Sequence, residues 1–319
     1  MPINCKSISG KWPLMNNMKT SNHSLSRRSF LGLSAAGTAA LLLPWQLDLL
    51  AQEAVTLVKV TGGTPEEALA AALDALGGLG QFGASGKTVV VKPNIGWDRT
   101  PEQGANTDPD LVAAAVKAFK GEGAKVQVFD FTCNSAERCY ARSGIEAAAK
   151  AAGADVSHVH EKRFDVIPLP EGQKLRAWPI YRDWLRADLR VNLPILKHHS
   201  LAGVTAGLKN LMGVMGGSRS SIHNGFHQKL IDVAQPILPQ ITVVDARRVM
   251  VKNGPTGGSL DDVRLMNTLI AGFDIVAVDA ESARVFGRDP LELGYLKEAQ
   301  SRGLGSIERP AGYKEIVLG

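Results

Sequence analysis

The densest group of chemically active side chains lies between Lys197 and His227. This segment combines basic, amide and glycine residues, and no acidic residue occurs in it. Glycines allow backbone N–H groups to approach a ligand closely, and lysine and arginine supply positive charge. The segment is therefore predicted to bind a carboxylate or phosphate group of a small molecule, through Lys197, His199, Thr205, Lys209, Asn210, Arg219 and His223. A basic surface loop is the alternative interpretation.

The histidines of this segment add acid/base chemistry or metal binding. Four of the six histidines beyond residue 51 fall here: His198, His199, His223 and His227. Imidazoles transfer protons near neutral pH, which favours His199 and His223 as catalytic residues together with Lys197. The spacing of His223 and His227 also suits two metal ligands on one helical face, with His199 as a third. Gly225 between them disfavours a regular helix, and no Glu separates them as in zinc proteases.

The elements that must position these residues follow an alternating order. Short β-branched segments alternate with Ala-rich helical segments, which predicts an α/β fold with a mixed, mainly parallel sheet flanked by helices. The expected strands and helices are strands 55–60, 88–92, 125–130, 189–193, 241–245 and 265–271, and helices 65–76, 108–119, 145–152, 206–211, 276–286 and 291–302. Segments 163–169 and 174–180 flank Pro170-Glu171-Gly172 and predict a small antiparallel hairpin. Residues 55–319 are expected to form a single domain, with a division into two lobes near residues 155–190 as the alternative.

Polar residues follow four of the predicted strands. Lys92 and Asn94 lie at the end of one, and Asp130, Lys197 and Asp245 at the ends of three others. Ligands bind at the carboxyl ends of strands in open α/β sheets, because loops and helix N-termini converge there. We expect Lys92 to neutralise charge, Asn94 to orient the ligand, and Asp245 to orient a histidine or lysine.

The sequence contains no nucleotide-binding motif. Gly86-Lys87-Thr88 resembles the end of a phosphate loop, but Gln81 stands in place of its first glycine and a strand follows instead of a helix. Cys133 and Cys139 are compatible with a disulfide, a redox pair or two buried thiols. The cysteine spacing of ferredoxin-type clusters is absent. The cofactor is therefore unknown, and a metal ion or an iron–sulfur cluster remains a hypothesis.

The N-terminal residues have the pattern of a twin-arginine export signal. Arg27 and Arg28 precede an Ala- and Gly-rich apolar segment, residues 30–43, which is too short to cross a bilayer as a stable helix. We expect residues 1–54 to be a signal peptide and linker recognised by the twin-arginine export machinery. The mature protein is then predicted to be periplasmic or otherwise extracytoplasmic, without a stable transmembrane span.

The positive charge of the chain belongs to this leader. The formal net charge is +5, and residues 1–51 hold five of the 36 basic residues and one of the 31 acidic residues. The remaining chain is close to neutral, at about +1. A nucleic-acid partner is not expected, because its main electrostatic requirement is missing.

Several blocks of the chain resemble the domain of unknown function 362 family. They are residues 91–94 (Val-Lys-Pro-Asn), residues 192–199, residues 205–213, His223, Asp245, residues 254–258 and residues 274–279. The resemblance implies that Lys92, Asn94, Lys209, Asn210 and His223 belong to one site. It also implies that His199, in the family's Lys-x-His pattern, matters more than His198. Some members carry ferredoxin-like cluster domains, whose cysteines this chain lacks.

These observations favour an exported enzyme that performs redox or acid/base chemistry on a small anionic substrate or cofactor. Two alternatives remain open. One is a non-catalytic protein that binds an anion or assists a metalloenzyme, which needs the same cations but no proton-transfer residue. The other is an iron–sulfur redox protein with Cys133 and Cys139 among its ligands.

Overall fold

The computed structural model describes residues 54–319, which belong to one compact unit. The twin-arginine motif at Arg27 and Arg28 lies outside the described residues. Within them, no helix combines the length and the apolar character needed to traverse a bilayer.

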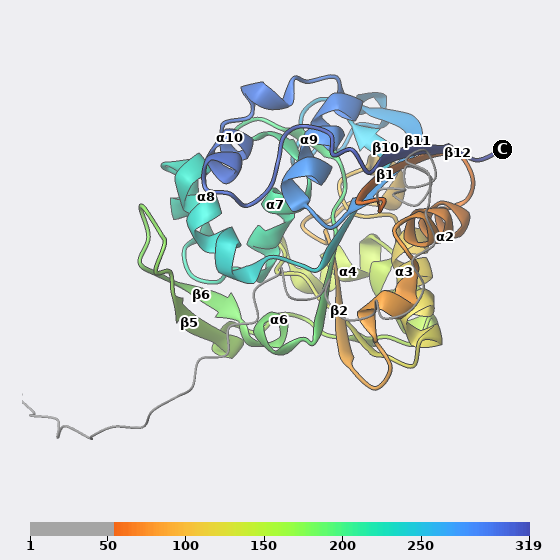
Figure 1. Ribbon diagram of the computed structural model, residues 1–319. Coiled ribbons are helices and arrows are strands. Elements are labelled where there is room, and N and C mark those ends of the chain that lie inside the picture. Colours follow the sequence, from red (N-terminus) through yellow and green to blue (C-terminus); the bar gives the residue numbers. More distant parts are fainter. Residues whose placement is uncertain (1–53) are drawn as a thin grey trace, which may run out of the picture. The chain divides into compact units, whose positions relative to one another are not determined.

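The centre of the unit is an eight-stranded sheet with the order β12-β1-β11-β10-β7-β2-β3-β4 (Figure 1). Only β11 runs against the others, because it pairs antiparallel with both β1 and β10 while the remaining pairs are parallel. The prediction of a mixed, mainly parallel sheet is confirmed. Its strands are β1 (Leu57–Thr61), β2 (Thr88–Pro93), β3 (Lys125–Val128), β4 (Asp155–Val156), β7 (Leu189–Leu193), β10 (Ile241–Met250), β11 (Val263–Gly272) and β12 (Tyr313–Val317).

Helices cover both faces of the sheet, and each face has its own apolar core. On β2, Val89 and Val91 point into one core and Val90 into the other, since successive side chains of a strand alternate between faces. One core is covered by α2 (Pro65–Ala75), α3 (Pro109–Gly121), α4 (Ala136–Arg142) and α5 (Ile145–Ala151). The other is covered by α6 (Arg182–Arg186), α7 (Gly207–Asn210), α8 (Phe226–Ala234), α9 (Ile275–Phe286) and α10 (Gly294–Ser301), with α7 to α10 grouped together in Figure 1.

Local sequence fixes where the first helices begin. Thr64 accepts a hydrogen bond from the Glu67 backbone N–H at 3.2 Å, and the Glu67 carboxylate accepts one from the Thr64 N–H at 2.8 Å. This capping box, followed by Pro65 at the first helical position, satisfies N–H groups that a helix leaves unpaired. Asp108 caps α3 in a similar way through the Asp110 N–H at 2.9 Å.

The predicted hairpin is present as β5 (Phe164–Pro168) and β6 (Ala177–Tyr181), which pair antiparallel. A second, shorter hairpin was not predicted; it joins β8 (Lys197–His199) to β9 (Gly203–Thr205). Its strands are three residues long and lack the apolar alternation that identifies longer strands. The predicted helix 291–302 is divided, because a 3-10 turn at Pro290–Glu292 precedes α10.

Candidate functional site

A cavity of about 700 Å³ opens where β2, β3 and the extension of β7 end. It is lined by eight of the residues that the sequence singled out: Asn94, Lys197, His199, Thr205, Lys209, Asn210, Arg219 and His223. They come from the loop after β2, the β8–β9 hairpin, α7 and the 3-10 helix Arg219–His223. The structure therefore brings residues that are up to 129 positions apart in the sequence together around one cavity.

Lys92 lies beneath this cavity in a buried ion pair. Its Nζ is 2.7 Å from Oδ1 of Asp130 and donates a hydrogen bond to the Pro93 carbonyl at 2.9 Å. Oδ2 of Asp130 accepts the Ile95 N–H at 2.7 Å. Burial lowers the pKa of Lys92, and the adjacent Asp130 carboxylate opposes that shift. The pair is locally neutral, so Lys92 fixes the strand ends rather than presenting charge to a ligand.

Gly213 lies directly over this pair. A Cβ at this position would stand 1.7 Å from Oδ1 of Asp130 and 2.7 Å from Nζ of Lys92. The Gly213 carbonyl also accepts the Phe131 N–H at 2.9 Å, which ties the two loops together. Only glycine permits this approach, because any side chain would collide with the ion pair.

Lys197 is also fully buried, but its surroundings differ. Its Nζ donates to the Ala105 carbonyl and lies 3.4 Å from Oδ1 of Asn94. Burial is the main cause that lowers its pKa to about 7, and the positive charges of Lys209 and Lys92 contribute. Among residues 54–319, no carboxylate approaches Lys197 within ion-pair distance.

Two asparagines form the amide part of the wall. Asn94 Nδ2 donates to Oδ1 of Asn210 at 3.2 Å, and Asn210 Nδ2 donates to Oδ1 of Asn192 at 2.9 Å. Asn210 also donates to the Lys92 carbonyl at 3.3 Å. These bonds hold the amides in fixed orientations, which lets Asn94 position both Lys197 and a bound molecule.

Lys209 and Arg219 bring further positive charge. Burial, followed in effect by Arg219, lowers the pKa of Lys209 to about 8. The Arg219 guanidinium donates to the Phe131 and Thr132 carbonyls, each at 2.7 Å, and stacks 4.0 Å from the Phe131 ring centroid. Within residues 54–319, neither cation has a carboxylate partner.

The two cavity histidines are in different hydrogen-bonding states. Nδ1 of His199 accepts the N–H groups of Leu201 and Ala202, both at 3.2 Å, so the ring is neutral and its proton is on Nε2. Burial and the neighbouring lysines lower the pKa of His199 to about 3. The His223 ring lies 6.3 Å away between centroids, and its pKa is lowered by burial and by Lys209. His199 is thus a hydrogen-bond donor, and His223 is the histidine whose protonation can change.

Thr205 contributes a hydroxyl group to the same wall. The residue is 3% exposed, and its Oγ1 has no hydrogen-bond partner among the described residues. A buried hydroxyl without a partner is costly, and one that lines a cavity is suited to donate to a ligand.

Asp245 lies outside the cavity. The strand β10 does not end at this residue but continues to Met250, so the carboxylate lies within the sheet. Its oxygens accept the N–H groups of Asp108 at 2.8 Å and Arg247 at 3.0 Å. Burial, with the nearby Asp108 charge, raises the pKa of Asp245 to about 6. The expected contact with a histidine or lysine is replaced by these backbone contacts.

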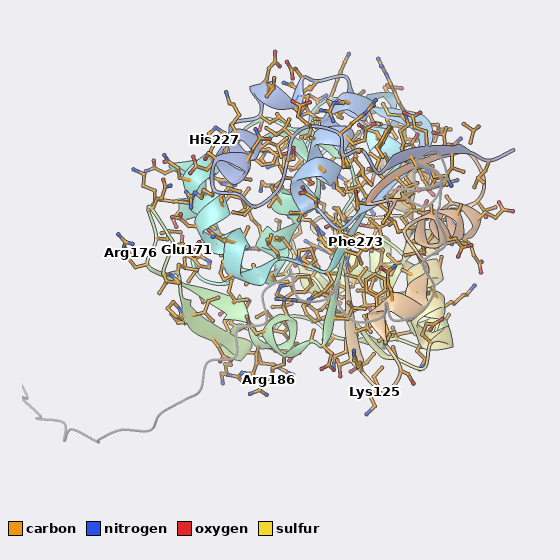
Figure 2. All side chains as sticks on the ribbon, viewed as in Figure 1. Lys125, Glu171, Arg176, Arg186, His227 and Phe273 are labelled. Atoms are coloured by element: carbon orange, nitrogen blue, oxygen red, sulfur yellow. The ribbon has the colours of Figure 1, made fainter. Side chains whose placement is uncertain are left out.

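His227 does not line this cavity, although it shares a second cavity with His223. It projects from α8 beside α10 (Figure 2), where its ring packs against Gly294 and lines that second cavity. The 3-10 helix that carries His223 ends at that residue, and Gly225, with a φ of 80°, caps the start of α8, so the two histidines do not share a helical face. In the part of the chain that the structure describes, no group of three His, Cys, Asp or Glu side chains is arranged to hold a metal ion.

Comparison with known proteins places this geometry in a family. A family model described as "Domain of unknown function (DUF362)" matches residues 89–284, which is more than half of the chain. The chain belongs to the DUF362 family. The match spans every residue that lines the cavity, from Asn94 to Pro255.

One relative of this DUF362 chain is the thylakoid-associated protein sll1697 of Synechocystis sp., which is 27% identical over 241 residues and covers 73% of each chain. Among solved structures, the lactate racemase apoprotein from Thermoanaerobacterium thermosaccharolyticum is similar with a TM-score of 0.48 and 17% identity. That alignment covers 71% of the DUF362 chain, which spans 56% of the length of the racemase chain.

Two cysteines of the DUF362 chain, Cys133 and Cys139, lie in the described residues, and they are both free and differ in exposure. Cys133 is exposed and lines the cavity, whereas Cys139 is buried in α4 with its Sγ 3.8 Å from the Gly96 carbonyl. Burial raises the pKa of Cys139 to about 11. Of the alternatives, the structure shows two separate thiols and no disulfide.

Sequence reasoning named Cys133 only as a redox, disulfide or cluster cysteine, and it did not select the aromatic part of the wall. Trp97, Phe131 and Cys133 line the cavity within three residues of the strand-end residues Asn94 and Asp130. A wider window after each strand end would have included them, because the loop that follows a strand contributes several residues to such a site.

Proposed function

We propose that this protein is an exported enzyme that binds a small anionic molecule in the cavity and performs acid/base chemistry on it. The observation that carries this proposal is a charge imbalance. Lys197, Lys209 and Arg219 line the cavity, and the single acidic lining residue in the described chain, Asp130, is already paired with Lys92. Lys197 is buried, and Lys209 and Arg219 are half-buried. Withdrawing cations from water without counter-charges is costly, and a bound anion would reduce that cost.

The remaining wall supplies neutral hydrogen-bond donors. The Nε2–H of His199 and the hydroxyl of Thr205 suit the oxygens of a carboxylate or phosphate. His223 is the cavity imidazole available for proton transfer: burial and Lys209 lower its pKa and so favour the neutral, basic form, and no hydrogen bond from the described residues fixes its tautomer. Proton abstraction from a carbon next to a carboxylate is the acid/base reaction that this set of groups supports best.

A non-catalytic anion-binding or metalloenzyme-accessory protein is the second candidate. It is favoured by one observation, namely that His199 is held as a donor by two backbone N–H groups and so does not act as a base. In this case His223 would contribute only to affinity.

The test of the anion site is calorimetry on the full-length protein with inorganic phosphate, lactate and malate. We expect at least one of these anions to bind, and K197M and K209M each to weaken binding by about tenfold or more, since hydrogen bonds to charged groups contribute about 1.5–3 kcal/mol. K150M is the matched control, because Lys150 is exposed and pairs with Glu146 on α5, away from the cavity. Binding that is equally strong in K197M, K209M and K150M would contradict the proposal.

The enzyme and the binding protein are distinguished in D₂O. If the protein abstracts protons, NMR will show deuterium entering the carbon next to the carboxylate of a bound acid, and H223Q will abolish this exchange while leaving affinity largely intact. If the protein only binds, the wild type will show no exchange above the buffer rate.

Export through the twin-arginine pathway is a separate part of the proposal. It rests on Arg27 and Arg28 and the short apolar segment that follows them. Substituting both arginines by lysine should leave the protein in the cytoplasmic fraction of its host, whereas the unaltered chain should appear outside the cytoplasmic membrane. Equal distribution of the two forms would exclude this route.

A further inference from the structure

The two buried lysines of the site differ in the groups that contact their Nζ atoms. Lys92 faces the Asp130 carboxylate at 2.7 Å and donates to the Pro93 carbonyl, so its environment suits an ammonium group. Within the described part of the chain, Lys197 has only two acceptors, both neutral: the Ala105 carbonyl and Oδ1 of Asn94. An ammonium has three N–H donors, whereas a neutral amine has two and a lone pair. The surroundings of Lys197 therefore match a neutral amine whose lone pair is unused.

A neutral amine in a cavity is a nucleophile. Lysines become nucleophilic when they are desolvated and lie next to another cation, because both conditions disfavour the protonated form. Lys197 is 1% exposed, it lines the cavity, and Lys209 is the nearby cation with the largest effect on it. Its pKa of about 7 leaves a substantial fraction of the amine unprotonated at neutral pH.

The rest of the cavity provides what a carbonyl substrate with an acidic group requires. Lys209 and Arg219 supply positive charge for a carboxylate, and Thr205 has a buried hydroxyl without a partner among residues 54–319. His223 can carry protons between the amine and the departing oxygen.

We propose that Lys197 forms an imine with a small carbonyl compound that carries a carboxylate, such as a 2-oxo acid. This inference rests on the proposed anion site and adds the reaction type and substrate class. Nζ of Lys197 adds to the carbonyl carbon, and His223 takes a proton from the nitrogen. That proton passes to the alkoxide oxygen and gives the carbinolamine hydroxyl. His223 then transfers the second nitrogen proton to this hydroxyl, which leaves as water while the C=N bond forms. One C–N bond is made, the C–O bond is broken, and no oxidant or reductant is needed.

Borohydride trapping tests this proposal on the full-length protein. Pyruvate is added, the mixture is treated with sodium borohydride, and the modified lysines are mapped by peptide mass spectrometry. Hydride reduces the imine to a stable secondary amine, so Lys197 should carry a 1-carboxyethyl group. We expect at least tenfold more modification at Lys197 than at any exposed lysine, such as Lys150. Trapping should become faster as the pH rises from 6 to 8, because the amine loses its proton over this range.

Two variants and a second ligand serve as controls for the trapping experiment. K197R keeps the positive charge and should lose the adduct, and K209M keeps the amine but should form the adduct more slowly because the carboxylate is held less well. Lactate has the same carboxylate without the carbonyl, so it should compete with pyruvate and never be trapped. The wild-type map is informative even where a variant fails to fold.

The outcomes separate this inference from the proposed function. If pyruvate binds by calorimetry but Lys197 is modified no more than exposed lysines, the imine is excluded and the anion site stands. If neither pyruvate, lactate nor phosphate binds, the anion site is excluded together with the imine.

Discussion

Buried charge is handled differently in two regions of this molecule. Around α8 to α10, two of the three buried acids have a cationic partner: Asp232 accepts Arg302 at 2.6 Å, and Glu281 accepts two nitrogens of Arg309 at 2.8 and 2.9 Å. The third, Asp279, accepts the backbone N–H groups of Gly207 and Leu208. Asp232 also accepts three backbone N–H groups from residues 173–175. In the cavity, by contrast, Lys197 lies among neutral acceptors and other cations.

This difference distinguishes charged groups that stabilise the fold from charged groups that are available to bind a ligand. A paired buried ion is strongly destabilising to disrupt, because its partner is left uncompensated. An unpaired buried cation already destabilises the empty protein, so its removal should relieve a cost while weakening the site. The two regions should thus respond to substitution with opposite signs, and the predictions below test that contrast.

The largest effect is expected for D232A in the paired region. It leaves Arg302, whose side chain is 8% exposed, with Glu298 as its remaining acidic partner, and it removes the acceptor of three backbone N–H groups. The free energy of unfolding should fall by about 3–5 kcal/mol, as found when buried pairs lose one member. Urea denaturation at pH 7 measures this, and anion affinity of the folded fraction should be unchanged. A loss below about 1 kcal/mol would mean that the pairing is not structural.

K197M should have the opposite effect on stability. Removing an uncompensated buried amine should raise the free energy of unfolding at pH 7 by about 1–2 kcal/mol, since burial disfavours the charged form. Phosphate or lactate affinity should fall in the same variant. K92M is the matched comparison, because it leaves Asp130 unpaired and should lower stability. If both variants are destabilised equally, the contrast between the two lysines is wrong.

The pH dependence follows from the lowered pKa values of Lys197, about 7, and Lys209, about 8. Anion affinity should be highest below pH 7 and weaken as pH rises through 7 to 8, by at most about tenfold per unit for each proton taken up.

The free energy of unfolding of the ligand-free protein should instead increase as the pH rises. Between these values and the ordinary lysine pKa of 10.5, the unfolded chain binds more protons than the folded one, so the free energy of unfolding rises with pH. Thermal melts from pH 6 to 10 should show this slope, and K197M should flatten it.

The smallest effect is expected for C133S. Cys133 lines the cavity, but it is neither a cation nor a fixed donor, and Cys139 is separately buried. Affinity for phosphate or lactate should stay within about twofold of the wild type, since an exposed substitution of similar size changes energies by less than about 0.5 kcal/mol. Iron found by elemental analysis in the wild type and lost in C133S would instead support the iron–sulfur alternative.

Most of the fold was predictable because it depends on local patterns. The alternation of apolar strands with Ala-rich helices identified the parallel part of the sheet, and Thr64 with Pro65 identified the start of α2. β12 was missed because its residues, Tyr313–Val317, include exposed charged side chains typical of a sheet edge. α8 was missed because it follows a glycine-rich segment, where helices are not expected.

The site was only partly predictable, and the reason lies in where strands end. Asn94 and Lys197 reach the cavity because β2 and β7 end just before them. Asp245 does not, since the residues after it, Ala246 to Met250, contain no turn signal and continue the strand. The tautomer of His199 depends on N–H groups of Leu201 and Ala202 in a hairpin turn, which no spacing in the sequence reveals.

The close approach of Gly213 to the Lys92–Asp130 pair has a consequence for how this family can diversify. At this position the cavity wall is backbone and not a side chain. A substitution therefore cannot reshape the wall there without disrupting the Lys92–Asp130 ion pair below it. Changes in ligand preference should therefore accumulate at other lining positions, such as residues 199–201, residues 217–220 and His223.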